Sequence, residues 1–237
     1  MIRVAAVGDL HYGADSTGTC AIDPDEIWAH ADLLLLAGDL TRVGAPAEAE
    51  LLARELAAVQ VPMFAVLGNH DYHADEAPAV VQRFADAGVD VLEGTGAVVK
   101  VNGARVGIAG TKGFGGGFAG ACGTDFGEPE MKAFVGHTKD LAGKFTHALA
   151  QLDADVRVAL LHYAPIKDTL LGERLEIYPF LGSYLLGQAV DEAGADLAVH
   201  GHAHGGTEKG VTPGGVHVRN VAQPVIRRPY RVYCIED

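Results

Sequence analysis

Three histidines separated by single residues form the part of the sequence with the clearest capacity for chemistry. His200, His202 and His204 lie in the segment DLAVHGHAHGG, residues 196–206, where a short apolar run leads into glycines. Neutral imidazole is a common ligand of transition metals, and glycine allows the backbone to bend around an ion. Alternate residues of an extended segment face the same side, so this spacing favours a metal site. A solvated polar turn is the alternative for this stretch taken alone.

Polar residues also follow three earlier apolar runs. Asp9, Asp39 and Asn69 each come directly after a glycine at the end of such a run, thirty residues apart, which is the length of a βαβ unit. His11 and His70 stand beside the first and third of them. Because the carboxyl ends of parallel strands lie along one edge of a sheet, where α/β proteins bind ligands, we expect these side chains to gather there.

A fourth apolar run ends in His162, so five predicted strand ends carry residues that bind metals. Mixed Asp, His and Asn ligands suit two adjacent divalent ions such as Mn, Fe or Zn, and a carboxylate can bridge them. Capping aspartates and core histidines could explain each residue separately, but they explain the whole set poorly. That set is Asp9, His11, Asp39, Asn69, His70, His162, His202 and His204.

The elements that position these residues follow from the spacing of apolar side chains. We expect strands at 2–7, 31–37, 62–67, 156–161 and from 197, and helices at 45–59, 77–87, 128–152 and 183–193. Asn102-Gly103 predicts a type I′ hairpin between 97–101 and 105–109, and therefore a mixed sheet. A hairpin across 213–215 and a last strand at 230–235 complete a mixed α/β pattern. No linker is evident, so one domain, 1–237, is expected.

Composition limits the classes of protein. Hydrophobic residues make up 49% and charged residues 21% of the chain, as in globular proteins. A net charge of −13 argues against broad binding of nucleic acid. The longest apolar run, 33–37, is too short to cross a membrane, and no signal peptide is apparent, so a cytoplasmic protein is expected. Cys20, Cys122 and Cys234 form no CxxC motif and are expected to be reduced thiols.

Residues 110–127 contain eight glycines in eighteen positions. This segment is either a flexible surface loop or a rim over the site. No GKS or GKT follows it, which argues against a P-loop. Candidate cations for a substrate phosphate are Lys112, Lys167 and Arg174, with Arg227 and Arg228 as further possibilities.

Taken in order, these motifs resemble those of the calcineurin-like metallophosphoesterases. The matching blocks are DLH at 9–11, GD at 38–39, GNHD at 68–71, His162 before Tyr-Ala-Pro, and GHAH at 201–204. The resemblance runs from residue 1 to about 222 and implies two mixed β-sheets sandwiched between helices, a four-layer α/β/β/α fold. It also implies the ligand sets: Asp9, His11, Asp39 and His204 for one ion, and Asp39, Asn69, His162 and His202 for the other, with Asp39 bridging.

The resemblance implies hydrolysis of a phosphoester. Two neighbouring ions can lower the pKa of a bridging water enough to supply hydroxide near neutral pH, and they can hold a phosphate oxygen for attack. His70 is outside the implied ligand set, and the resemblance places it beside the leaving oxygen as a catalytic residue. His200 has the wrong offset for a ligand, so we expect a core position or a supporting one.

Departures from the family narrow the expected substrate. Protein serine/threonine phosphatases continue the second block as GDxxDRG, whereas residues 38–44 read GDLTRVG here, so the aspartate that would orient His70 is absent. Nucleases of the family usually add a DNA-capping domain, for which this chain is too short and too acidic. We therefore expect a phosphodiesterase or broad phosphatase acting on small molecules. Diesters are favoured because no arginine clamp for a dianionic monoester is evident.

Other readings fit the motifs less well. The HxHxDH motif of metallo-β-lactamases would need Asp-His after His204, where Gly205-Gly206 stands, and amidohydrolase barrels would need HxH where Asp9-Leu10-His11 stands. A non-catalytic, metal-bound binding scaffold of the same fold is the alternative from another functional class. The presence of His70 and of every implied ligand favours the enzyme over the scaffold.

Overall fold

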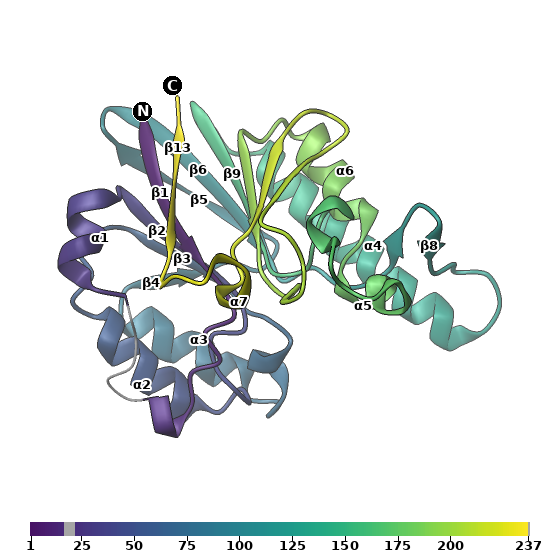
Figure 1. The fold of residues 1–237 in the computed structure, drawn as a ribbon, viewed down its shortest axis with the longest axis horizontal. Coiled ribbons are helices and arrows are strands. Elements are labelled where there is room, and N and C mark those ends of the chain that lie inside the picture. Colours follow the sequence, from purple (N-terminus) through teal and green to yellow (C-terminus); the bar gives the residue numbers. More distant parts are fainter. Residues whose placement is uncertain (17–21, 237) are drawn as a thin grey trace.

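Two β-sheets lie between layers of helices in the computed structural model, which describes residues 1–16 and 22–236 (Figure 1). The first sheet has the order β13-β1-β2-β3-β4. Its strands are β1 (Ile2–Val7), β2 (Leu33–Ala37), β3 (Met63–Val66), β4 (Val89–Val91) and β13 (Arg231–Ile235). β1 to β4 are parallel neighbours and β13 is antiparallel to β1. The carboxyl ends of β1, β2 and β3 therefore share one edge, as the thirty-residue spacing predicts.

The second sheet has the order β11-β12-β10-β9-β6-β5. Its strands are β5 (Thr95–Val101), β6 (Ala104–Thr111), β9 (Val156–Leu161), β10 (Leu197–His200), β11 (Lys209–Val211) and β12 (His217–Asn220). β5 and β11 are antiparallel edges on a parallel centre. Val101 pairs with Ala104, and Asn102 and Gly103 have φ angles of 50° and 90°. The predicted two-residue hairpin is confirmed, and both sheets are mixed.

Alternation along β1 explains the layering. Val4 and Ala6 pack between the sheets with residues such as Ile108 of β6, whereas Ala5 and Val7 pack on the opposite face. That opposite face meets α1 (Pro24–His30), α2 (Pro46–Leu56) and α3 (Ala77–Asp86), and a third core joins the second sheet to α4 (Pro129–Ala150) and α6 (Tyr184–Glu192). Three cores separate four layers, which confirms the α/β/β/α arrangement (Figure 1).

The connections hold the shorter elements. These are β7 (Gly117–Phe118), β8 (Ala121–Cys122), α5 (Tyr178–Leu181), α7 (Gln223–Ile226) and the 3₁₀ turns η1 (Ala14–Ser16), η2 (His70–Tyr72), η3 (Asp168–Leu170) and η4 (Leu175–Ile177). Cys122 and Cys234 are free, exposed thiols, and Cys20 lies outside the described residues. None of the described helices combines the length and apolarity that crossing a bilayer requires.

The buried face of α4 differs from the stripe that the sequence predicts. Apolar residues at helical spacing predict a buried stripe of Met131, Phe134, Leu141, Phe145, Ala148 and Leu152. Met131 is 37% exposed, however, whereas the buried positions of the helix include Thr138. The Thr138 hydroxyl donates to the carbonyl oxygen of Gly115 at 2.5 Å, so the glycine-rich segment packs on a polar position that hydropathy cannot identify. The backbone N–H of Gly116 donates to the carbonyl oxygen of Pro179, and that of Gly117 donates to the carbonyl oxygen of Gly182. This part of the segment is packed between α4 and the 179–182 region.

Candidate metal centre

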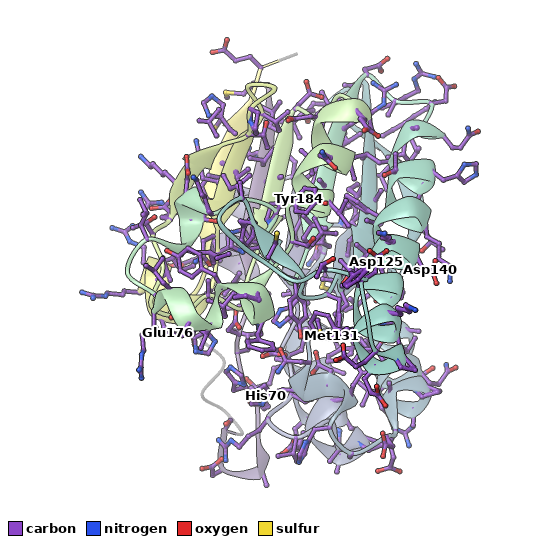
Figure 2. All side chains as sticks on the ribbon, turned by 90° about the vertical axis from the view of Figure 1, so that its right-hand side faces the viewer. His70, Asp125, Met131, Asp140, Glu176 and Tyr184 are labelled. Carbon is purple, nitrogen blue, oxygen red and sulfur yellow. The ribbon has the colours of Figure 1, made fainter. Side chains whose placement is uncertain are left out.

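The predicted site residues lie in the loops that follow the central strands of both sheets. Asp9 and His11 follow β1, Asp39 follows β2, Asn69 and His70 follow β3, His162 follows β9, and His202 and His204 follow β10. In Figure 2, His70 is labelled where the faint purple and blue ribbon of the N-terminal part of the chain meets the faint green ribbon of later segments. The fold therefore brings together residues that are separated by up to 195 positions in the sequence, such as Asp9 and His204.

Within residues 1–16 and 22–236, three groups of side chains bring their ligand atoms within 4.8 Å of one another. They are Asp9, His11 and His204; His11, Asp39 and His70; and Asp39, His162 and His202. The side-chain oxygen of Asn69 lies 3.1 Å from Nε2 of His162 and extends the third group. Asp39 belongs to two of the groups. Carboxylates and imidazoles held at this spacing are a donor set that fits divalent transition metals.

Left-handed backbone is concentrated at this centre. Asp9, His11, Asp39 and His202 have φ angles of 58°, 45°, 50° and 69°. Non-glycine residues rarely adopt this conformation, which costs on the order of 1–3 kcal/mol per residue and tends to occur at functional sites. The surrounding structure must therefore hold these four side chains in place. All four are Asp or His, types that adopt this conformation more often than most, but the sequence does not mark which Asp and His residues do so.

Two motif glycines are required by the close approach of neighbouring loops. A Cβ atom on Gly68 would collide with the carboxylate of Asp39, and a Cβ atom on Gly201 would collide with the carboxylate of Asp9. Each carboxylate therefore occupies the space that a side chain would take on the adjacent loop. The glycines of the GN and GH blocks thus permit the acidic and histidine loops to meet.

Hydrogen bonds to backbone carbonyls fix two of the imidazole rings. Nδ1 of His162 lies 2.9 Å from the carbonyl oxygen of Ala37, and Nε2 of His202 lies 3.2 Å from that of Phe180. Because a carbonyl accepts only a donor, Nε2 of His162 and Nδ1 of His202 keep their lone pairs for a ligand. Burial lowers the pKa of each ring to about 3, so both are neutral at physiological pH.

Asp9 and His204 form the polar pair at the other end of the cluster. Nε2 of His204 lies 2.8 Å from Oδ1 of Asp9, and the backbone N–H of His202 donates to the same carboxylate at 3.0–3.1 Å. Burial raises the pKa of Asp9 to about 6, and the hydrogen bond to Asp9 raises the pKa of His204. Bringing cations to this buried carboxylate would stabilise its charged form.

The orientation of His70 comes from the main chain. Nδ1 of its ring lies 2.7 Å from the carbonyl oxygen of Arg42, and its backbone N–H donates to Oδ1 of Asp39 at 2.8 Å. Nε2 is 3.9 Å from Oδ2 of Asp39, and the ring centroid is 4.5 Å from that of His11. The carbonyl of Arg42 therefore takes the place of the aspartate that is absent from the second block.

Asp71 is a structural residue of the site that sequence reasoning missed. Its buried carboxylate accepts from Gly68 N at 2.8 Å, from Thr41 N at 2.8 Å and from the Thr41 hydroxyl at 2.6 Å. Burial raises the pKa of Asp71 to about 6, although these hydrogen bonds oppose the shift. Asp71 connects the loop after β2 to the loop after β3. Its place after Asn69 and His70 in the GNHD block is the signal that could have identified it.

Two further residues support the histidine loop after β10. His200 is buried, and its Nδ1 donates to the carbonyl oxygen of Gly201 at 2.7 Å. Its Nε2 lies 2.8 Å from the hydroxyl oxygen of Thr169. Burial lowers its pKa to about 4. The structure thus places His200 in the core beneath the loop, where the sequence predicts a core or supporting position. Glu173, which sequence reasoning missed, accepts from Gly205 N at 2.6 Å.

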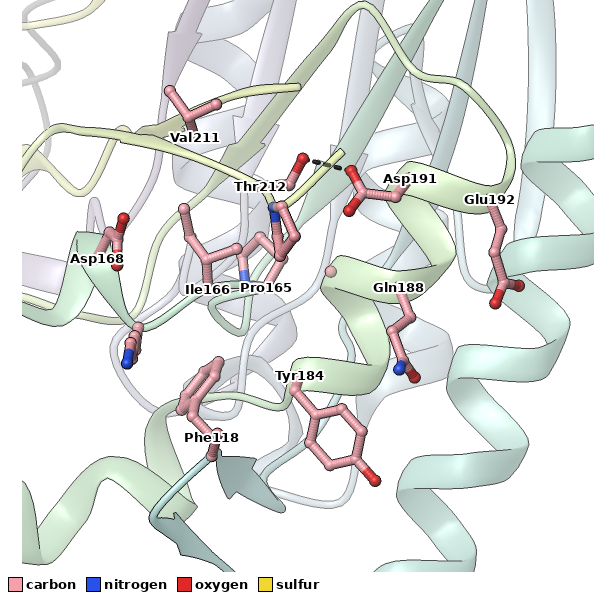
Figure 3. A pocket seen from close by; sticks show the side chains of 14 residues that line it. Phe118, Pro165, Ile166, Asp168, Tyr184, Gln188, Asp191, Glu192, Val211 and Thr212 are labelled. Carbon is pink, nitrogen blue, oxygen red and sulfur yellow. Dashed lines mark hydrogen bonds between the residues drawn. The ribbon is translucent and has the colours of Figure 1, made fainter. Parts of the chain in front are cut away.

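The three basic residues predicted to bind substrate are dispersed. Lys112 lies beside His162, whose backbone N–H donates to the carbonyl oxygen of Lys112 at 3.3 Å. Lys167 lines a cavity of about 600 Å³ between η3, α6 and the segment 211–213, and none of the described metal-ligand candidates lines it (Figure 3). The side chain of Arg174 is 83% exposed, and its Nε forms an ion pair with Oε2 of Glu176 at 3.8 Å. Only Lys112 of these three is brought to the cluster.

Comparisons with known proteins identify the family and support the fold. The family model for calcineurin-like phosphoesterases matches residues 2–206. A search among curated proteins returned no match. The solved structure of phosphopantetheinyl hydrolase from Mycobacterium tuberculosis is similar over 98% of this chain and 96% of that one, with a TM-score of 0.71 and 16% identity. The protein TT1561 of Thermus thermophilus matches over 99% of both chains, with a TM-score of 0.56 and 16% identity. At these identities the two structures support the fold alone.

Proposed function

Because the chain belongs to the calcineurin-like phosphoesterase family, we propose that it is a phosphoester hydrolase that uses two divalent ions and acts on small molecules. The observation that carries this proposal is the position of Asp39, which belongs both to the group with His11 and His70 and to the group with His162 and His202. A carboxylate between two such groups can serve two ions at once.

The proposed ligand sets follow the clusters. Asp9, His11, Asp39 and His204 would hold one ion, and Asp39, Asn69, His162 and His202 the other. Two bound ions would acidify a water molecule between them and neutralise charge on the phosphoester. Manganese, iron and zinc are the candidates, because mixed carboxylate and imidazole donors suit borderline divalent ions.

His70 is the proposed catalytic residue. Its Nδ1 proton is committed to the Arg42 carbonyl, and its other nitrogen faces the side of Asp39. A ring held in this way can stabilise negative charge that develops on the leaving oxygen, or donate a proton to it. His70 sits next to His11 with a half-exposed side chain, so a substrate can reach it.

A small substrate is favoured by the charge of the protein. The chain carries a formal net charge of −13, so a polyanion would be repelled by most of the surface. Attraction of a phosphoester must then come from the bound ions and from a few nearby cations. The preference for diesters over monoesters stays a prediction from the sequence, and a metal-bound scaffold without activity stays the alternative function.

The test is hydrolysis of a panel of chromogenic phosphate monoesters and diesters by protein loaded with manganese. The proposal expects turnover that a chelator abolishes and that manganese restores. The variant Asp140→Asn, which changes an exposed carboxylate on α4, serves as a control for handling and folding. If fully metal-loaded protein hydrolysed no member of a broad panel, the scaffold would become the better account.

A further inference from the structure

Lys112 occupies a special position relative to the metal-ligand candidates. It follows β6 directly, and its carbonyl oxygen accepts from the backbone N–H groups of His162 and Tyr163, at 3.3 and 2.9 Å. Asp39 is close enough for its charge to attract the ammonium group of Lys112, and the ammonium group in turn helps to keep the ring of His162 neutral. The backbone of Lys112 is thus connected to the strand end that carries a candidate ligand.

Three aromatic rings surround the Lys112 ammonium. Nζ lies 5.0 Å from the ring centroid of Phe114, 5.2 Å from that of Tyr72 and 5.4 Å from that of Tyr163. Contacts of this kind attract a cation and restrict where it can move. Tyr72 belongs to the 3₁₀ turn that begins at His70, and Tyr163 packs on the ring of His202 with centroids 4.3 Å apart. The cage is therefore built on the loops of the candidate centre.

The ammonium has no oxygen partner within the described ranges 1–16 and 22–236: none of the hydrogen bonds or ion pairs there involves Nζ. The neighbouring carboxylate of Glu93 accepts instead from the Lys112 backbone N–H at 3.1 Å and from the Thr111 hydroxyl at 2.7 Å. An ammonium group carries three donors, and rings satisfy none of them as an oxygen would. Lys112 is thus a positioned cation whose N–H groups have no oxygen acceptor among the described residues.

We propose that Lys112 binds a non-bridging phosphate oxygen of the substrate and selects dianionic phosphates, so that it favours monoesters relative to diesters, against the preference that the sequence predicts. The inference rests on the proposed phosphoester hydrolase function. In a monoester dianion, three non-bridging oxygens share two negative charges. In a diester, two non-bridging oxygens share a single charge. A compact ammonium held at the edge of the centre acts on phosphate as a point charge and gains most from the additional charge. Lys112 is thus a specificity-determining residue.

The experiment compares the affinities of two anions for manganese-loaded protein by isothermal titration calorimetry. Inorganic phosphate represents the dianion, and dimethyl phosphate represents the diester monoanion. The variants are Lys112→Met, which keeps the length of the side chain without its charge, and Lys112→Arg, which keeps the charge. Lys144→Met, at an exposed position of α4, is the matched control. The ratio of kcat/KM for a monoester and a diester with the same nitrophenol leaving group is measured in parallel.

The inference expects Lys112→Met to weaken phosphate binding by roughly ten- to a hundredfold, the range for a lost charge-assisted hydrogen bond, with dimethyl phosphate changed much less. Lys112→Arg should restore most of the difference, and Lys144→Met should match the unaltered protein. An equal loss for both anions, or no loss for either, would overturn the inference while leaving the metal centre intact. Failure of the unaltered protein to take up manganese, seen before any anion is added, would instead overturn both the proposed function and this inference.

Discussion

Nδ1 of His70 lies 2.7 Å from the carbonyl oxygen of Arg42, so the main chain determines which nitrogen of this histidine faces the candidate metal centre. A carbonyl oxygen accepts a hydrogen bond at every pH, whereas a carboxylate partner would itself titrate. The ring therefore keeps its orientation and its Nδ1 proton without a charged partner. This arrangement accounts for a family motif from which the orienting aspartate is missing.

Replacing His70 separates catalysis from metal binding. His70→Ala should leave metal content near that of the unaltered protein, because the two proposed ligand sets do not include it. Turnover should fall by roughly two or more orders of magnitude, as expected for loss of a general acid or of charge stabilisation. Steady-state kinetics with elemental analysis of the same samples measures both. His73→Ala, three residues along and exposed, is the control. Unchanged turnover would remove His70 from the mechanism.

Replacing Asp39 tests whether its carboxylate serves both ions. Asp39→Asn keeps the size of the side chain but removes one anionic oxygen, so both metal affinities should fall together, each by at least roughly tenfold. Metal titrations followed by calorimetry provide the measurement, with Asp140→Asn as the comparison. A variant that still held two ions tightly would contradict the shared position of Asp39.

Asp71 should contribute to stability through the two loops that it connects. Asp71→Ala removes the acceptor of three buried backbone N–H groups, those of Leu40, Thr41 and Gly68, and of the Thr41 hydroxyl, and buried donors left without partners are costly. We expect the free energy of unfolding to fall by about 3 kcal/mol. Thr41→Val removes the hydroxyl that donates to Asp71 and accepts from Gly44 N at 3.1 Å, but it leaves the backbone donors their carboxylate, so it should cost less, about 1–2 kcal/mol. Urea denaturation of both variants checks this order, and equal costs would argue against Asp71 as the connecting residue.

The sequence predicts the strands and the polar residues at their ends because both depend on local patterns. Glycine followed by a polar residue after each apolar run locates Asp9, Asp39 and Asn69, and Asn102-Gly103 predicts its hairpin through φ angles that few other pairs tolerate. The resemblance supplies the sandwich of two sheets, which periodicity alone does not reveal. The prediction of one domain over 1–237 stays a prediction.

The remaining features depend on contacts between distant segments, which side-chain type does not encode. The partner of His70 is a main-chain carbonyl that any residue at position 42 would offer. Met131 is apolar yet exposed, while Thr138 is polar yet buried, because the glycine-rich segment packs against the Thr138 side of α4. Among the candidate cations, Lys112 is distinguished from Lys167 and Arg174 only by its surroundings in three dimensions.

His200 makes the metal-free protein sensitive to acid. Burial lowers its folded-state pKa to about 4 from an ordinary value of 6.5, so the unfolded chain binds this proton more readily than the folded one. Stability is then complete above about pH 6.5 and is lost as the pH falls toward 4, by up to about 3 kcal/mol. His200→Gln should reduce that loss by a similar amount. Urea unfolding of chelated protein at pH 7 and pH 4.5 tests this, and parallel pH profiles would contradict it.

The most direct test of the metal centre is the number of ions that each chain binds. Purified protein is chelated, dialysed against manganese, iron or zinc, and analysed for metal content, together with Asp39→Asn and His70→Ala. The proposed centre predicts two ions per chain in the unaltered protein and in His70→Ala, and a clear deficit in Asp39→Asn. A content of no ion, or two ions retained by Asp39→Asn, would contradict a centre built around Asp39.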